Sequence, residues 1–135
     1  VQLYETEEGR GVTMEKPKEY SLTREVTDEM TAKRIGNAGA RILSTPNMLA
    51  LMEAAALELS KAYLDEGTTT VGAEAHIRHL APTPVGMKVT ATATLRSIER
   101  RKLWFDIVVN DEKGKCGEGS HLRIMVPNKD RSKPE

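Results

Sequence analysis

The chain has 135 residues, with 20 lysines and arginines, 20 aspartates and glutamates, and one cysteine. This length fits a single domain with a modest core, and a formal net charge of zero gives no overall attraction to nucleic acid or to an anionic membrane. One cysteine excludes an internal disulfide framework, and no stretch is long and apolar enough for a membrane span or a signal peptide, so we expect a cytoplasmic protein.

The two ends of the chain differ from its middle in composition. Residues 1–18 are mostly polar, and Met14 precedes the first segment with a folding pattern, so we expect a flexible N-terminal segment or an expression remnant. Residues 19–127 are expected to form the folded domain. Residues 128–135 contain no apolar side chain and are predicted to be a solvated tail.

A long helix is predicted after an early strand at residues 20–26. Thr45-Pro46 is typical of a helix start, because a threonine oxygen can accept backbone N–H groups and proline suits the first helical position. We expect the helix to run to about Leu64, before Gly67, and to be covered on most sides, because its first half has almost no polar face.

Glu53 is the one charged residue in an otherwise uncharged and mostly apolar run from Ile42 to Leu57. A carboxylate in apolar surroundings costs several kcal/mol unless it is paired or its pKa moves. Two interpretations remain open. Glu53 is either a structural acid tied to an amide or an arginine, or a general base whose pKa is raised by its surroundings.

Period-two alternation predicts strands in the second half of the chain. In the first of them, Val71, Ala73, Ala75 and Ile77 are expected on the covered face, and His79 continues that face at the end of the strand. Further strands are predicted at residues 87–96, 103–109 and 116–126, the last after an Asp-Glu-Lys-Gly turn. One long helix followed by antiparallel strands predicts an α+β fold, in which a curved antiparallel sheet wraps the helix.

Four segments occur in an order that identifies a family. They are Ser44-Thr45-Pro46-Asn47-Met48 with Leu51-Met52-Glu53-Ala54-Ala55, then Val71-Gly72, then His79-Leu80-Ala81-Pro82-Thr83-Pro84-Val85-Gly86, and then Gly117-Glu118-Gly119-Ser120-His121. Over residues 20–126 the chain resembles the hotdog-fold thioesterases of the fluoroacetyl-CoA thioesterase-like group. The ordered set is far more specific than any single motif.

The resemblance implies a hotdog-fold acyl-CoA thioesterase that works as a homodimer, with active sites between protomers and with neither metal nor cofactor. A tetramer of two such dimers is the alternative assembly. The family's catalytic residues fall on Thr45, Glu53 and His79. Gly72 and Arg123 fall on positions that line the substrate site. Thr45, Glu53 and His79 have the residue types that the family pattern requires.

One segment departs from the family pattern. Where the fluoroacetate-specific enzyme has aromatic residues that form a lid, this chain has Ile35-Gly36-Asn37-Ala38-Gly39-Ala40. We therefore expect hydrolysis of a small acyl-CoA, with a different or broader range of acyl groups than fluoroacetyl alone. The alternatives are a non-catalytic acyl-CoA binding protein and a hotdog enoyl-CoA hydratase or dehydratase.

Each candidate residue also has a structural interpretation. Thr45 can serve as a helix cap as well as a catalytic group, and the helix start can offer N–H groups to a thioester oxygen. His79 can be a core histidine or a catalytic group at the rim of the sheet. Arg123 is a candidate for substrate or phosphate contact. We assign no catalytic role to His121 or Cys116, and we expect the basic turn of Arg100 to Lys102 to be solvated surface, with contact to coenzyme A as the alternative.

Helix geometry sets a condition on the catalytic residues. At about 1.5 Å per residue, Thr45 and Glu53 lie roughly 12 Å apart along one helix axis. They cannot hydrogen-bond within one chain. If both act on one thioester, we expect them to come from different protomers, because Thr45 of one protomer can then lie nearer to Glu53 of its partner than to its own Glu53.

Overall fold

The structure is a computed structural model that describes residues 3–4 and 14–132. The expected N-terminal segment and C-terminal tail therefore lie partly outside the described residues. Within the described part, strand β1 (Leu3–Tyr4) pairs antiparallel with β2 (Met14–Glu15).

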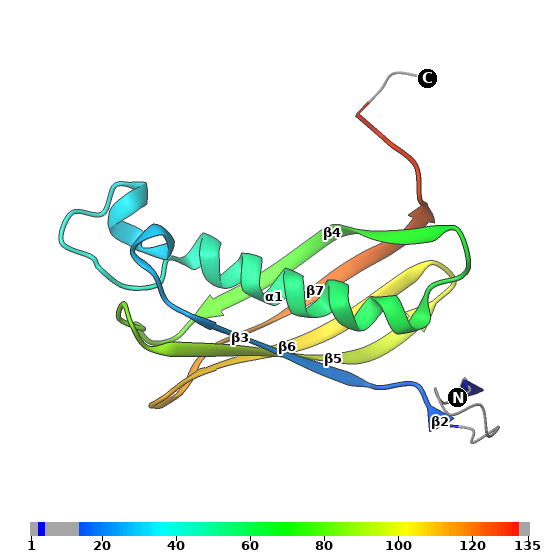
Figure 1. Cartoon of the computed structure of the whole chain (residues 1–135), viewed down its shortest axis with the longest axis horizontal. Coiled ribbons are helices and arrows are strands. Elements are labelled where there is room, and N and C mark those ends of the chain that lie inside the picture. Colours follow the sequence, from blue (N-terminus) through cyan, green and yellow to red (C-terminus); the bar gives the residue numbers. More distant parts are fainter. Residues whose placement is uncertain (1–2, 5–13, 133–135) are drawn as a thin grey trace.

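Five antiparallel strands form the main sheet, and each of them lies at a position where the sequence predicted a strand. Their order across the sheet is β3-β5-β6-β7-β4, so β3 and β4 are the two edges. Figure 1 shows the sheet curving around the one long helix. The strands are β3 (Glu19–Glu25), β4 (Thr68–His79), β5 (Lys88–Glu99), β6 (Lys102–Asp111) and β7 (Gly114–Pro127).

The long helix α1 spans Thr45–Ser60 and continues as a short 3-10 helix, η3 (Lys61–Tyr63). Its cap is Ser44, whose hydroxyl accepts the backbone N–H of Asn47 at 3.2 Å. Capping by Thr45 is therefore wrong. The serine is one residue earlier, in the extended conformation that a cap requires, and Thr45 is the first helical residue with its hydroxyl available elsewhere.

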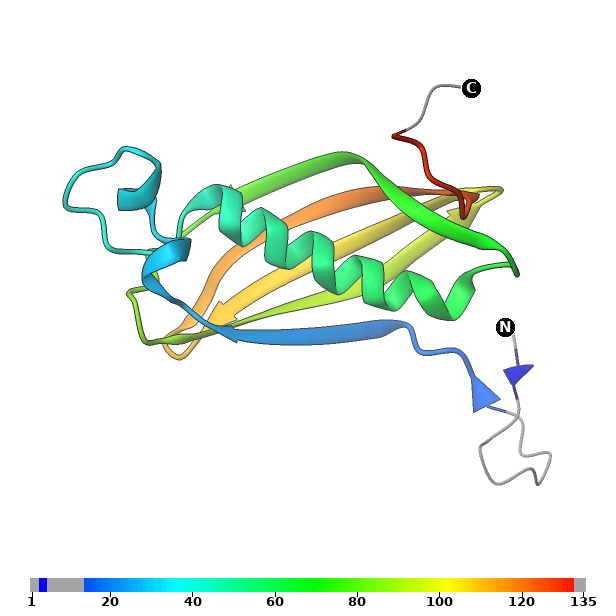
Figure 2. The same ribbon diagram turned by 45° about the horizontal axis from the view of Figure 1, so that its top comes forward.

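Two short 3-10 helices, η1 (Asp28–Met30) and η2 (Ala32–Ile35), lie between β3 and α1. With the loop that follows them, they project beyond the N-terminal end of α1 in Figure 2. The backbone N–H of Leu43 bonds to the carbonyl of Thr83 at 2.8 Å. This contact holds the segment before the helix against the β4–β5 connection.

The core lies between α1 and the concave face of the sheet. Burying these apolar side chains is the main source of stability. The fully or nearly fully buried members are Val26, Leu43, Met48, Leu51, Met52, Ala55, Ala56, Leu59, Val89, Ala91, Ala93, Leu103, Phe105, Ile107, Val109 and Cys116.

Only one side of α1 is covered in the single chain. Ala50 is exposed on the opposite side, and Leu49, Glu53, Ala54 and Leu57 are half-exposed there. The expectation that the helix is covered on most sides is therefore wrong for one protomer, because one sheet can cover only one face of a helix.

A β-bulge in β4 changes which residues face the helix. Gly72 pairs with Arg123 and Glu74 pairs with Leu122, which leaves Ala73 without a partner in the ladder. Before the bulge Thr70 is 4% exposed and Val71 is 39% exposed. The predicted inward position of Val71 is wrong, because one extra residue reverses the alternation.

Two glycines of β7 allow α1 to pack closely on the sheet. A side-chain Cβ at Gly117 would lie 2.4 Å from the sulfur of Met48, and one at Gly119 would lie 2.0 Å from the carbonyl oxygen of His76. Neither site has room for a side chain. The methionines of α1 occupy this space with their flexible thioethers.

No helix in residues 3–4 and 14–132 is long and apolar enough to cross a membrane.

Candidate functional site

The hydroxyl of Thr45 and the ring of His79 meet at the N-terminal end of α1. Thr45 Oγ1 lies 2.8 Å from His79 Nδ1. Since Ser44 caps the helix, the threonine hydroxyl is not used in capping. His79 is at the last position of β4, where it faces the helix because of the bulge. Two residues 34 positions apart in the sequence thus form a hydroxyl–imidazole pair.

The other ring nitrogen of His79 has an unusual environment. Among the described residues, Nε2 of His79 is buried and has no hydrogen-bond partner. Buried polar atoms are nearly always paired. If Nδ1 accepts the threonine proton, this nitrogen carries the N–H of the ring.

A cavity of about 560 Å³ opens beside Thr45 and His79. Its wall is mostly apolar and includes the segment before α1. The cavity is lined by Ala32, Ile35, Asn37, Ala40, Ile42, Leu43, Ser44, Thr45, Pro46, His79, Leu80, Ala81 and Pro82. Three residues of the segment that departs from the family pattern, Ile35, Asn37 and Ala40, are therefore part of this wall, and none of them is aromatic.

The first turn of α1 offers fewer free N–H groups than expected. The N–H groups of Asn47 and Met48 bond to the side chain and carbonyl of Ser44, and Pro46 has no N–H. In this turn, the backbone N–H of Thr45 is therefore the donor that is left to bind a thioester oxygen.

Glu53 lies farther along α1, and its surroundings differ from the expected apolar burial. Its side chain is 42% exposed, and Oε2 lies 3.9 Å from Nη1 of Arg123. The interpretation of Glu53 as an acid paired with an arginine agrees with this contact. The helical stretch itself contains no basic residue, and the cation is supplied by β7.

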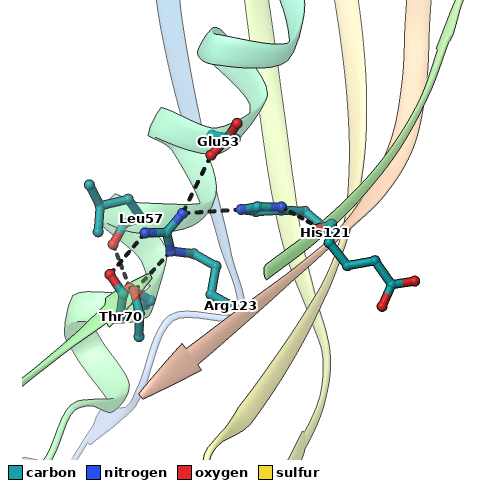
Figure 3. A network of polar contacts seen from close by, with 7 residues as sticks. Glu53, Leu57, Thr70, His121 and Arg123 are labelled. Carbon is teal, nitrogen blue, oxygen red and sulfur yellow. Dashed lines mark hydrogen bonds and ion pairs between the residues drawn. The ribbon is translucent and has the colours of Figure 1, made fainter. Parts of the chain in front are cut away.

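Arg123 is held from several sides (Figure 3). Its Nε donates to Thr70 Oγ1 at 2.8 Å, its Nη2 donates to the Thr70 carbonyl at 2.9 Å, and its Nη1 lies 3.1 Å from His121 Nε2. The Thr70 and Ser60 hydroxyls are 3.0 Å apart, and Ser60 donates to the Leu57 carbonyl at 2.7 Å. We call Glu53, Ser60, Thr70, His121 and Arg123 the Arg123 network.

The guanidinium in this network is nearly inaccessible to solvent. The Arg123 side chain is only 8% exposed, and burial lowers its pKa while the charge of Glu53 raises it. With Nε and Nη2 directed at Thr70, only Nη1 faces the carboxylate. The contacts of Arg123 thus connect it to Glu53 and to the protein interior.

Gly72 provides space beside Glu53. A Cβ at this position would lie 3.1 Å from Glu53 Oε2, 3.2 Å from His121 Cε1 and 3.4 Å from Arg123 Nη1. The expected site residues Gly72 and Arg123 therefore both adjoin Glu53.

His121, which the sequence analysis left without a role, belongs to the same cluster. It is 2% exposed, and its Nδ1 lies 2.8 Å from the carbonyl oxygen of Glu74. Burial lowers the pKa of His121, and the adjacent Arg123 charge lowers it further, against opposing effects of the Glu74 carbonyl and Glu53. Its position two residues before Arg123 in a strand was the available signal, because such residues share a face.

The candidate residues thus form two groups in one chain. Thr45 and His79 are at the start of α1, and Glu53 with Gly72 and Arg123 is two turns along it. Helix geometry gives a separation of roughly 12 Å between the two groups along the axis.

Other polar groups lie apart from these two clusters. Cys116 is a buried free thiol whose pKa is raised by burial. Arg100 and Arg101 form the β5–β6 turn, near the end of the sheet opposite the start of α1 in Figure 1. In residues 3–4 and 14–132, no three His, Cys, Asp or Glu side chains are grouped to hold a metal ion.

Comparison of the sequence with known families gives one match over most of the chain. Residues 26–129 match the family described as fluoroacetyl-CoA-specific thioesterase, FlK. The fluoroacetyl-CoA thioesterase of Streptantibioticus cattleyicolor is 35% identical over 85 residues, which are 63% of this chain and 61% of that protein. The match thus spans less than two thirds of that relative's length.

Solved structures with the same arrangement include thioesterases. A mutant of the fluoroacetyl-CoA-specific thioesterase FlK, in complex with fluoroacetate and CoA, has a TM-score of 0.76 at 28% identity over 85% of this chain and 97% of that one. A thioesterase superfamily member from Thermus thermophilus has a TM-score of 0.76 at 26% identity, over 84% and 85% of the two chains. The predicted α+β hotdog fold is confirmed.

Proposed function

The chain belongs to the fluoroacetyl-CoA-specific thioesterase family, and from this premise we propose that it hydrolyses a small acyl-CoA thioester to the free acid and coenzyme A. The observation that carries the proposal is the 2.8 Å contact between Thr45 Oγ1 and His79 Nδ1 beside a cavity of about 560 Å³. A hydroxyl bonded to an imidazole is an activated nucleophile, which hydrolysis of a thioester requires.

In the proposed first step, Thr45 Oγ1 attacks the thioester carbonyl carbon while His79 Nδ1 accepts the hydroxyl proton. The carbon–sulfur bond then breaks, the protonated imidazole returns the proton to the leaving thiolate, and an acyl-threonine ester remains. The short Oγ1–Nδ1 contact supports this order of events, because the base already lies within proton-transfer distance of the nucleophile.

In the proposed second step, water hydrolyses the acyl-threonine ester with Glu53 as the base. Glu53 takes a proton from the water while the water oxygen bonds to the acyl carbon. Glu53 then passes this proton to Thr45 Oγ1 as the ester bond breaks. Every step uses only side chains and water, so the proposed reaction requires no cofactor or metal ion. In a shorter route no acyl-threonine forms. Glu53 then either activates a water that attacks the thioester carbonyl or attacks that carbonyl itself.

We propose that Glu53 acts on the substrate bound at Thr45 of the partner protomer. Two features support a homodimer. The face of α1 that carries Glu53 is uncharged apart from this residue and is left uncovered by the sheet. The edge strand β4 is exposed over residues 71–76, and an exposed edge offers backbone groups for pairing.

The proposed acyl group is small and not restricted to fluoroacetyl. The end of η2 and the loop that follows it line the cavity with Ile35, Asn37 and Ala40, which leaves the wall without an aromatic lid. An apolar wall favours short aliphatic or branched acyl chains.

Release of coenzyme A from a panel of acyl-CoAs tests the activity. The panel contains acetyl, fluoroacetyl, branched, aryl and enoyl thioesters, with Thr45→Ala, Glu53→Gln and His79→Ala as variants. Turnover that all three variants reduce supports the proposal, and mass detection of an acyl group on Thr45 selects the two-step route. Binding without turnover indicates an acyl-CoA binding protein, and loss of enoyl absorbance without release of coenzyme A indicates a hydratase.

Mixing two inactive variants tests the shared site. In a dimer of Thr45→Ala with Glu53→Ala, one of the two sites retains both residues. After free exchange half of the dimers are mixed, so the mixture is expected to regain about a quarter of the wild-type activity. No recovery, with exchange of protomers verified by native mass spectrometry, contradicts the proposal that Thr45 and Glu53 come from different protomers.

A further inference from the structure

We propose that His121 is a positioning residue that orients Arg123 toward Glu53, and that it does so only as the neutral ring protonated at Nδ1. The inference rests on the proposed thioesterase function for its kinetic test. Its structural content depends only on the two contacts of the ring.

The contacts determine the tautomer. The carbonyl oxygen of Glu74, 2.8 Å from Nδ1, can only accept a hydrogen bond, so Nδ1 carries the proton. Arg123 Nη1, 3.1 Å from Nε2, can only donate, so Nε2 is the bare acceptor. A doubly protonated ring would lose the second contact and place two cations against each other.

The acceptor at Nε2 has a geometric consequence for Glu53. Thr70 holds the Nε side and Nη2 of the guanidinium, and His121 holds Nη1, the nitrogen that lies 3.9 Å from Glu53 Oε2. With planar donors held on these sides, the guanidinium cannot turn away from the carboxylate. His121 therefore fixes the guanidinium charge of Arg123 toward Glu53, although His121 itself makes no hydrogen bond to Glu53.

The groups around the ring make this arrangement sensitive to acid. Arg123 faces it from β7, Glu53 from α1 and the Glu74 carbonyl from β4, while Phe105 is its uncharged partner on β6. The pKa of His121 is lowered from 6.5 chiefly by burial, so the neutral form is retained below the usual titration range of histidine. Further acidification protonates the ring and removes the acceptor.

Two amide variants separate the contacts of the ring. The amide of Gln reaches the place of Nε2 and can accept from Arg123, whereas the amide of Asn reaches only the place of Nδ1. We expect His121→Asn to lower kcat by roughly 10- to 100-fold with KM changed less than about threefold, and His121→Gln to keep kcat within about threefold of wild type. Equal kcat values for the two variants, whether unchanged or equally reduced, would overturn the proposal.

The pH profile provides a readout that a packing role would not move. The ratio of wild-type to His121→Gln activity is expected to fall as pH decreases, because only the wild type loses its acceptor by protonation. The effects of pH on groups that both proteins share cancel from the ratio. A ratio that stays constant from about pH 7.5 to about pH 4.5 contradicts the proposal.

Nitrogen NMR of the ring tests the inference without any substrate. The expected spectrum of the wild type at neutral pH has a protonated Nδ1 and a bare Nε2 at His121. The opposite tautomer cannot accept from Arg123 and would refute the inference. If the wild type hydrolyses no acyl-CoA, the proposed function fails, and this spectrum still decides the role of His121.

Discussion

The Thr45–His79 pair and the Arg123 network are parts of one candidate site, and they are constructed in opposite ways. Thr45 is exposed, is bonded to one imidazole nitrogen and lies beside an open cavity. Arg123 is nearly buried and is held by Thr70 and His121, with Ser60 behind them. The difference separates two tasks. A nucleophile needs room for substrate, whereas a fixed charge needs a rigid environment prepared before the reaction.

The two constructions have different local origins. At the start of α1, Ser44 caps the helix, so the neighbouring hydroxyl of Thr45 is not used in capping and contacts His79 instead. In the Arg123 network, strands β4 and β7 align Thr70, Gly72 and Arg123 on the face beneath the helix. One arrangement depends on neighbouring residues, and the other depends on strand register.

The largest expected effect comes from removing the negative charge of Glu53, which Arg123 faces. Glu53→Gln keeps the size of the side chain and is expected to lower kcat by about 10²- to 10⁴-fold, the usual range for loss of a general base. Unfolding stability should change by less than about 1 kcal/mol, because the ion pair is long at 3.9 Å and its carboxylate is 42% exposed and screened by solvent. Activity within a few-fold of wild type would show that the network is structural.

A smaller effect is expected from filling the space next to Glu53. Gly72→Ala places a Cβ about 3.1 Å from Glu53 Oε2, so the carboxylate or the His121 ring must shift. We expect kcat to fall roughly tenfold, since misplacement by a fraction of an ångström weakens catalysis. Thr69→Ala on the same strand is the control. Equal kinetics for the two variants would mean that the space at Gly72 is not needed.

The far end of the Arg123 network should affect stability more than activity. In Ser60→Ala the Thr70 hydroxyl, which accepts from Arg123, loses the acceptor for its own proton. A buried unsatisfied hydroxyl costs about 1–3 kcal/mol, so chemical denaturation should show a loss in this range. With folding retained, kcat should stay within about twofold, because the Nη1 contacts remain. A large loss of kcat would extend the functional part of the network to Ser60.

The smallest expected effect is a difference in unfolding free energy between variants of Ser44 and Thr45, the two neighbours at the start of α1. Ser44→Ala is expected to cost about 1 kcal/mol of unfolding free energy, because it removes the helix cap. Thr45→Ala keeps the cap and is expected to cost less, because the Thr45 position is exposed, while it removes the hydroxyl of the pair. Thermal unfolding of the two variants checks this order. The reverse order would return the cap to Thr45.

The sequence also left part of the Arg123 network unidentified. The role of Arg123 as a substrate contact stays a prediction, and in the structure its donors are directed to Thr70, His121 and the carboxylate of Glu53. His121 was set aside because it lies among glycines and alternates opposite to Leu122, Ile124 and Val126. Contacts between β7 and α1 depend on which residues share a face under the helix, and no short motif encodes that relation.

The sequence by itself determined the order of the elements, the family and three central candidates, Thr45, Glu53 and His79. These conclusions rest on local rules, because helix starts, period-two alternation and ordered motifs are written in neighbouring residues. Only the tertiary structure decided the cation beside Glu53, the role of His121 and the outward position of Val71. Each depends on the bulge at Ala73 and on strand register, which arise from pairing between segments distant in the sequence.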